Sequence, residues 1–223
     1  MYKVAILGGT GDLGFGLALR LAMAGYDVFI GSRRREKAVE AAEKGLQILG
    51  GGGRLRGESN SDAAADADVI FFSIPFQGVG EIAADVAGRM KASSVAVSCI
   101  VPFGDESLTT SAAEFLKGLI PGDVAVVSAL HTVSAERLAR ISEPVDTDTF
   151  IFGDVWEAKK RVAALLGDVD GLRPVDGGPL KNSRIGEQLV KILLSVNKRY
   201  RVRDAGIRVS GLGDDRVRRG WEL

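Results

Sequence analysis

Short apolar segments alternate with longer amphipathic ones along most of the chain. Apolar and β-branched runs predict strands at residues 3–7, 27–30, 54–58, 68–73, 94–100, 123–130, 149–152 and 171–175. Apolar residues at helical spacing predict helices between them at 13–24, 34–49, 77–90, 110–119 and 157–166. Such alternation is typical of an α/β fold in which helices cover both faces of a parallel sheet.

The alternation ends near Asp176. One long helical stretch at 182–197 follows, and then a basic tail in which residues 196–223 hold eight Lys/Arg against four Asp/Glu. We therefore expect a large domain at 1–176 and a small helical C-terminal domain with a basic tail at 177–223. The tail beyond about Gly211 is expected to fray, because chain ends are poorly ordered unless they are tied down.

Charge and composition exclude several classes of protein. Lys+Arg is 29 and Asp+Glu is 29, so the formal net charge is zero. Binders of nucleic acids and membrane surfaces need an excess of positive charge, so we expect neither partner. A hydrophobic content of 46% is typical of a globular protein, and the longest apolar runs are too short to span a bilayer. No signal peptide is apparent, so a cytoplasmic location is expected.

Only one cysteine, Cys99, and one histidine, His131, are present. A single cysteine excludes an intramolecular disulfide and a cysteine cluster that binds metal. A single histidine excludes a histidine-rich metal site in the same way. We therefore predict no metal centre.

A glycine-rich turn, GGTGDLG at 8–14, stands directly between the first predicted strand and the first predicted helix. In this context glycines let the backbone approach a pyrophosphate, and the helix N-terminus offers unpaired N–H groups to it. The alternative is an ordinary glycine-rich turn, but the strand–turn–helix context favours a nucleotide site. The predicted binding residues are Gly8, Gly9, Thr10, Gly11, Asp12, Leu13 and Gly14.

The end of the second predicted strand indicates which dinucleotide binds. A site that prefers NAD places an acid there to bind the ribose 2′-hydroxyl. Here the strand is followed by Ser32, Arg33, Arg34 and Arg35, with Lys37 beyond. Guanidinium groups suit a 2′-phosphate, and basic residues at a helix start oppose the helix dipole unless an anion binds. We therefore predict NADP; the alternative is a solvated basic turn.

Further loops leave the carboxyl ends of predicted strands, where parallel sheets bind ligands. Ile74 and Phe76 follow the fourth strand and supply either an apolar wall for a nicotinamide ring or core packing. Phe103 lies in the loop after the fifth strand. His131 follows the sixth and is either a hydrogen-bond donor to a bound ring or a structural histidine. Arg184, at the start of the last long helix, is placed to point into a cleft between the two domains.

Residues for acid–base chemistry are scarce. No Tyr–Lys pair at helical spacing follows a serine, which argues against short-chain-dehydrogenase chemistry. The sequence also lacks a second nucleotide-binding motif of the kind that would bind a flavin. Direct hydride transfer between two stacked rings mainly needs orientation and exclusion of water. The candidate site is suited to that kind of reaction.

Together these motifs resemble the NADPH-dependent coenzyme F-420 reductases (F-420H2:NADP oxidoreductases) of archaea and some bacteria. The resemblance is carried by LGGTGDLG at 7–14, GLALRLA at 16–22, GSRR at 31–34, VSALHT at 127–132, DGLRP at 170–174, GPL at 178–180 and NSR at 182–184. It is colinear from about residue 2 to about residue 210. It implies a doubly wound, Rossmann-type NADP-binding domain at 1–176, a small C-terminal domain, and a homodimer or larger homo-oligomer.

The resemblance also implies roles for individual residues. NADP would be bound by Thr10 to Leu13, by Ser32, Arg33 and Lys37, and by the loops at Ile74, Phe76 and Phe103. The deazaflavin of coenzyme F-420 would stack on the nicotinamide near His131, Val133, Ala135 and Arg184. Hydride would pass between nicotinamide C4 and deazaflavin C5 without a covalent intermediate, and Thr10 and His131 would be the catalytic residues because they orient the rings.

Some positions depart from the family pattern. Gln188 and Val190 stand where small hydroxyl residues are typical, and Asp105 and Glu106 stand where basic residues are expected near an anionic deazaflavin tail. These departures motivate a second hypothesis, in which the acceptor is a flavin, a quinone or a small carbonyl compound. The scarcity of acid–base residues motivates a third, in which the protein is a non-catalytic NADP(H)-binding sensor whose basic tail meets a partner.

The last predicted helix has apolar positions at Leu189, Ile192, Leu193 and Val196. These side chains either cover the nucleotide-binding domain or face a second subunit. Symmetric homodimers are the commonest assemblies, so a homodimer is expected.

Overall fold

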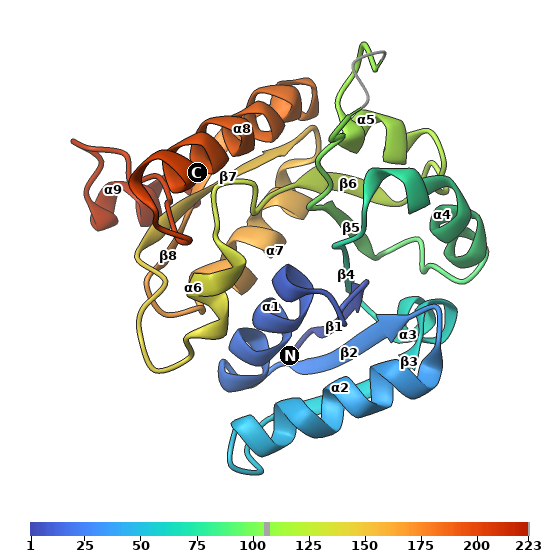
Figure 1. The fold of residues 1–223 in the computed structure, drawn as a ribbon. Helices are drawn as coiled ribbons and strands as arrows, with labels where there is room; N and C mark the ends of the chain where they lie inside the picture. The colour runs from blue at the N-terminus through green and yellow to red at the C-terminus, as the bar shows by residue number, and fades with distance from the viewer. Residues whose placement is uncertain (105–107, 223) are drawn as a thin grey trace.

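The strands form one eight-stranded sheet in the order β3-β2-β1-β4-β5-β6-β7-β8 (Figure 1). The computed structural model describes residues 1–104 and 108–222. Asp105 and Glu106, two of the departures noted above, lie outside the described residues. The strands are β1 (Lys3–Leu7), β2 (Asp27–Ser32), β3 (Arg54–Ser59), β4 (Val69–Phe72), β5 (Val95–Ser98), β6 (Ala125–Ser128), β7 (Thr147–Gly153) and β8 (Leu172–Gly178).

The helices that fall at predicted places are α1 (Asp12–Met23), α2 (Arg35–Ile48), α4 (Val79–Ala87), α5 (Ala112–Lys117), α7 (Trp156–Gly167) and α8 (Ser183–Tyr200). Each corresponds to a predicted helix. Three short helices were not predicted: α3 (Asn60–Asp66), α6 (Ala135–Ala139) and α9 (Asp214–Gly220). Each is two turns long or less, so each shows little helical period in the sequence. Two 3₁₀ turns, η1 (Phe76–Gly78) and η2 (Leu180–Asn182), precede α4 and α8.

The sheet is doubly wound, as predicted. The strand β1 pairs with β2 on one side and β4 on the other, so the direction of winding changes between β1 and β4. The expectation of a wholly parallel sheet was wrong at one place, because β7 is antiparallel to β6. The connection between these two strands, residues 129–146, contains the five-residue helix α6, which is attached to α1 through Arg20.

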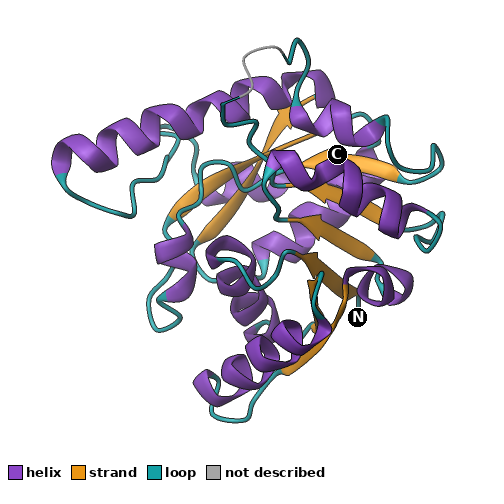
Figure 2. Ribbon diagram, turned by 45° about the vertical axis from the view of Figure 1, so that its right-hand side comes forward, coloured by secondary structure: helices purple, strands orange, loops and turns teal. Residues whose placement is uncertain are grey.

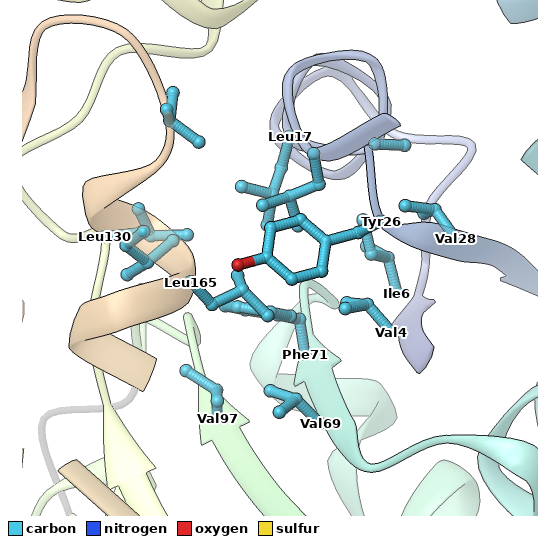
Figure 3. Packing of buried hydrophobic residues seen from close by; sticks show 14 of the residues in the cluster. Val4, Ile6, Leu17, Tyr26, Val28, Val69, Phe71, Val97, Leu130 and Leu165 are labelled. Carbon is cyan, nitrogen blue, oxygen red and sulfur yellow. The ribbon is translucent and has the colours of Figure 1, made fainter. Parts of the chain in front are cut away.

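Alternate residues of β1 serve two separate cores. Val4 and Ile6 belong to the core under α1, α2 and α7, whereas Ala5 and Leu7 belong to the core under α3, α4 and α5. Figure 3 shows the first core, where Ile6, Leu17 and Phe71 lie around the ring of Tyr26. Because successive strand side chains point to opposite faces, an uninterrupted apolar strand requires helices on both sides.

The C-terminal segment crosses back over the sheet. The helix α8 is long, and Figure 2 shows its far end projecting beyond the body of the molecule. The predicted domain boundary at residue 176 falls inside β8, and the division at that point remains a prediction.

The expectation that the tail frays beyond Gly211 was wrong. Asp214 at the start of α9 lies 2.8 Å from Arg173 Nη1. Trp221 donates its indole N–H to the carbonyl of Pro174 at 2.8 Å and stacks on Trp156. These contacts join residues distant in sequence, so the tail composition alone could not reveal them.

Candidate functional site

The turn after β1 is built for close approach of backbone atoms. Gly8 has φ +74°, and a Cβ there would lie 2.4 Å from the carbonyl oxygen of Ser73. A Cβ at Gly14 would lie 2.9 Å from the carbonyl oxygen of Gly8, so glycine lets α1 start directly against the turn. Gly11 is the N-cap of α1 and has no side chain to occupy the first N–H groups of the helix. Those groups are available to a phosphate.

The glycine turn opens into a pocket of about 550 Å³, here called the glycine-turn pocket. It lies beyond the carboxyl ends of β1, β2 and β4, at the switch in strand order where doubly wound sheets bind ligands. Seven predicted site residues line it: Gly8, Thr10, Gly11, Ser32, Arg33, Lys37 and Ile74. The structure thus brings the predicted phosphate turn and the predicted basic cluster to one pocket.

Three exposed cations surround one end of the glycine-turn pocket: Arg33, Arg34 and Lys37. Ser32 is buried, and its hydroxyl accepts the backbone N–H of Arg34 at 3.3 Å. Arg35 differs from the other cations, because its guanidinium lies 3.0 Å from the carboxylate of Glu58. A cluster of cations with little neutralising charge favours a bound anion.

The other predicted residues around the turn have different surroundings. Gly9 is buried, and Leu13 packs against the core beneath α1. Phe76 is half-buried, with its ring centroid 5.3 Å from that of Phe115. Phe103 is 45% exposed, and its carbonyl accepts the side-chain N–H of Gln77 at 3.4 Å. The roles of these residues in binding remain predictions.

His131 follows an unusual backbone position. Leu130, two residues after the end of β6, has φ +71°, a left-handed conformation that costs a non-glycine residue about 1–2 kcal/mol. Its N–H donates to the hydroxyl of Thr149 at 2.8 Å, and its side chain is fully buried. Tertiary contacts therefore hold the bend that directs His131 away from the strand.

The imidazole of His131 is buried and neutral. Burial lowers its pKa to about 4, although the hydrogen bond to Ile100 acts in the opposite direction. Its Nε2 lies 3.2 Å from the carbonyl oxygen of Ile100, and a carbonyl only accepts, so Nε2 carries the proton. The expectation that His131 donates to a bound ring is therefore corrected. Its Nδ1 is an acceptor and has no hydrogen-bond partner among the described residues.

His131 lines a second pocket of about 500 Å³, the His131 pocket. The predicted residues Val133 and Ala135 line it too, as does Asp12 from the glycine turn. The two pockets therefore lie on either side of the same turn, since Gly11 lines one and Asp12 lines the other.

Comparisons with known proteins agree with this arrangement. Residues 3–102 match the family model described as NADP oxidoreductase coenzyme F420-dependent. The chain is 38% identical to the F420-dependent NADP reductase of Methanothermobacter thermautotrophicus, over 94% of this chain and 95% of that protein. It is 37% identical to the enzyme of the same name from Methanocaldococcus jannaschii, over 94% of this chain and 99% of that protein.

The chain belongs to the F420-dependent NADP reductase family. A crystal structure from Arthrobacter sp. fb24, assigned provisionally as an F420-dependent NADP reductase, has the same fold with a TM-score of 0.79. That comparison covers 94% of this chain and 100% of the other at 22% identity, so it bears on the fold alone.

In this member of the F420-dependent NADP reductase family, α8 presents three different faces. Val190, Leu193 and Asn197 line the His131 pocket. Arg184, Glu187 and Gln188 line a separate pocket of about 190 Å³ between α8 and the loop before α5, here called the α8 pocket. Ile185 and Ile192 are about 60% exposed on the remaining face.

Two expectations about α8 are resolved by these faces. Arg184 does not share a pocket with His131, and its guanidinium donates to the carbonyl of Thr109 at 2.9 Å. Of the two departures from the family pattern, Val190 faces the His131 pocket and Gln188 does not. Residues 188 and 190 are separated by about 200° around a helix, so they cannot face one pocket.

The sequence reasoning missed the wall of the His131 pocket that α6 provides. The residues of this wall are Ser134, Ala135, Glu136 and Ala139. The helix is attached to α1 by Arg20, which is only 3% exposed. A signal was available, because Arg20 interrupts the apolar stretch 16–22, and a charge in a buried helix face needs partners.

Within residues 1–104 and 108–222, no group of three or more His, Cys, Asp or Glu side chains is placed to bind a metal ion. Over the same residues, no helix combines the length and the apolar character needed to cross a bilayer.

Proposed function

We propose that this chain transfers a hydride between NADP(H) and coenzyme F-420. The observation that carries the proposal is its identity of 37–38% to F420-dependent NADP reductases over 94% of its length. The two pockets that meet at the glycine turn support it, since hydride transfer needs two ring systems in contact.

NADP fits the glycine-turn pocket by charge and shape. The first N–H groups of α1 would bind the pyrophosphate, with Thr10 and Gly11 at the mouth of the turn. Arg33 and Lys37 would bind the 2′-phosphate, with Ser32 beside them. Ile74 would face the nicotinamide half of the cofactor; its side chain is within the glycine-turn pocket and buried.

The deazaflavin fits the His131 pocket. Val133 and Ala135 would pack on its ring, and the free Nδ1 of His131 would accept a hydrogen bond from a ring N–H or from the nicotinamide carboxamide. Because the imidazole of His131 is buried and neutral, it would orient the rings by hydrogen bonding and would not exchange a proton with solvent-exposed groups. Thr10 and His131 act in this proposal by orienting the two rings.

The chemistry supplied by the two coenzymes is a two-electron transfer. One hydride passes from C4 of NADPH to C5 of the deazaflavin, one proton is taken from water, and NADP⁺ and reduced F-420 result. No covalent bond to the protein forms. The protein contributes orientation and exclusion of water.

The test is an assay of the purified protein with NADPH and oxidised F-420. We expect the deazaflavin absorbance and the NADPH absorbance to fall at equal rates. No loss over hours would remove the proposal. Parallel assays with a flavin, a quinone and a small carbonyl compound test the alternative acceptors. Tight NADP(H) binding without turnover on any of them would instead support the sensor hypothesis.

The assembly is also proposed rather than observed. The residues Ile185, Leu189, Ile192 and Val196 form one apolar stripe along the outer face of α8. Ile185 is 61% exposed and Ile192 is 60% exposed, so these apolar side chains of α8 are in contact with water in the single chain. We propose that this stripe packs against a second copy in a homodimer. A cytoplasmic location remains part of the proposal.

A further inference from the structure

A buried amide in the glycine-turn pocket has an unused acceptor. Asn60, the first residue of α3, is only 2% exposed and lies in the wall of this pocket. Its Oδ1 is buried and accepts no hydrogen bond from any residue within 1–104 and 108–222. Buried side-chain oxygens without a partner are uncommon in folded proteins, so a donor from outside the chain, either a water or a ligand group, is indicated.

The position of Asn60 shows which part of a ligand it would meet. In the pairing of β2 with β3, Ser32 lies opposite Ser59, so Asn60 comes one residue past the end of β2. A Cβ at Gly31 would lie 2.9 Å from Asn60 Oδ1, so glycine at position 31 leaves the space that the amide occupies. In doubly wound sheets the end of β2 is where the adenosine ribose binds.

The surroundings of Asn60 also point to the phosphorylated ribose. Ser32, Arg33 and Lys37 line the same pocket, and Arg33 and Lys37 are the cations assigned above to the 2′-phosphate. A carboxamide offers one acceptor and two donors in a small side chain. A carboxylate of the same shape would bring a negative charge toward the phosphate.

We propose that Asn60 is a specificity-determining residue that recognises the 2′-phosphorylated ribose of NADP. Its Oδ1 accepts from the ribose 3′-hydroxyl, and its amide N–H donates to the 2′-phosphate. This assignment rests on the proposed function only in requiring that the glycine-turn pocket binds NADP. It adds a neutral residue to the basic cluster found from the sequence.

The test is calorimetric binding to the full chain, which does not depend on turnover. The probes are NADP⁺, NAD⁺ and adenosine 2′,5′-bisphosphate, and the last of these isolates the phosphorylated ribose. For Asn60→Asp we expect the affinity for NADP⁺ and for the bisphosphate to fall at least about tenfold, and that for NAD⁺ to fall less than about threefold. Asn60→Ala serves as the second variant, with a loss of about threefold to tenfold.

Asn182→Asp is the matched control, because Asn182 lies in η2 before α8 and its amide donates to Gly177. We expect it to bind the bisphosphate as the natural chain does. Unchanged affinity for the bisphosphate in both Asn60 variants would overturn the assignment of Asn60 while leaving NADP binding intact. Equal losses for NAD⁺ and NADP⁺ would overturn it as well. If the natural chain bound neither NADP⁺ nor the bisphosphate, the proposed function itself would fail.

Discussion

The buried guanidinium of Arg20 on α1 donates from Nε to the backbone carbonyl of Leu138 on α6, at 3.0 Å. Its Nη2 reaches three more carbonyls of the same segment, those of Arg137, Arg140 and Glu143, at 2.6–2.9 Å. One cation therefore fastens α6 and the turn after it to the helix that begins at the glycine turn. Arg20 thus links α1 to the helix that forms a wall of the His131 pocket.

Replacing Arg20 with methionine keeps the length of the side chain and removes every one of these donors. Because several carbonyls then lose a buried partner, we expect the free energy of unfolding to fall by about 3 kcal/mol. We also expect the KM for coenzyme F-420 to rise more than the KM for NADPH, because α6 lines the His131 pocket. Urea denaturation and steady-state kinetics measure the two effects.

The matched control is Arg216→Met, since Arg216 is exposed on α9. We expect a change of less than about 0.5 kcal/mol there. Equal rises in the two KM values for the Arg20 variant would contradict a specific role in shaping the His131 pocket.

Arg33→Ala should change the preference between the two nicotinamide coenzymes. Arg33 is exposed at the end of the glycine-turn pocket, where it would meet the 2′-phosphate. We expect the affinity for NADP⁺ to fall about tenfold to a hundredfold, as for one lost charge-assisted hydrogen bond, and that for NAD⁺ to stay within about threefold. Titration calorimetry with both coenzymes gives the ratio.

Arg35→Ala is the control for that ratio, because Arg35 is already paired with Glu58 at 3.0 Å. If Arg33→Ala leaves the ratio of the affinities for NADP⁺ and NAD⁺ unchanged, the assignment of Arg33 to the 2′-phosphate is wrong.

Glu187 should make stability depend on pH. Its buried carboxylate accepts the backbone N–H groups of Ala112 and Ala113 at 3.1 and 3.3 Å, which joins α8 to the start of α5. The pKa of Glu187 is raised to about 7, chiefly by burial, with a smaller increase from Glu114 and opposing decreases from the two N–H donors and Arg184. The folded protein therefore holds a proton that the unfolded chain, with an ordinary glutamate, has already released.

A raised pKa in the folded state means that this contribution is fully present below about pH 4.5 and is lost as pH rises toward 7. We expect the free energy of unfolding of the natural chain to fall between pH 5 and pH 8, by up to about 3 kcal/mol relative to Glu187→Gln. Urea denaturation of both proteins at the two pH values measures this. A difference between them that does not vary with pH would exclude titration of Glu187.

Ile192→Glu should disrupt the proposed dimer. Ile192 is 60% exposed at the middle of the apolar stripe of α8, and a carboxylate there would be buried without a partner on association. We expect the natural chain to sediment as a dimer and the variant as a monomer at micromolar concentration. Lys181→Glu, at an exposed position in η2, should leave the mass unchanged. If the natural chain is a monomer, the apolar stripe of α8 is not a dimer interface.

The short-range patterns predicted much of the fold. Val4 to Leu7 form a central strand because an uninterrupted apolar run buries the side chains of both its faces only between two layers of helices. The glycine turn was recognisable because Gly8 and Gly14 are needed at a fixed spacing, one for its positive φ and the other for close packing. The basic cluster was recognisable because Ser32 ends β2 and Arg33 follows it directly.

Patterns on α8 were more ambiguous. Apolar positions at Val190, Ile192 and Leu193 all fit a helix, but a sequence does not show which neighbours surround it. The structure places Val190 and Leu193 at the His131 pocket and leaves Ile192 exposed. The family resemblance placed Arg184 beside His131, and Arg184 lies in the α8 pocket instead.

The sequence by itself determined the order of strands and helices, the phosphate-binding turn and the basic end of β2, because each depends on residues that are close together in the chain. The tertiary structure alone decided that Asn60 meets Gly31, that Arg20 holds α6, and that Nδ1 of His131 is the free nitrogen. Each of those contacts joins residues 29 to 118 positions apart. Only the packing of the whole sheet brings such residues together, because the periodicity of a local segment does not indicate which distant residue it will contact.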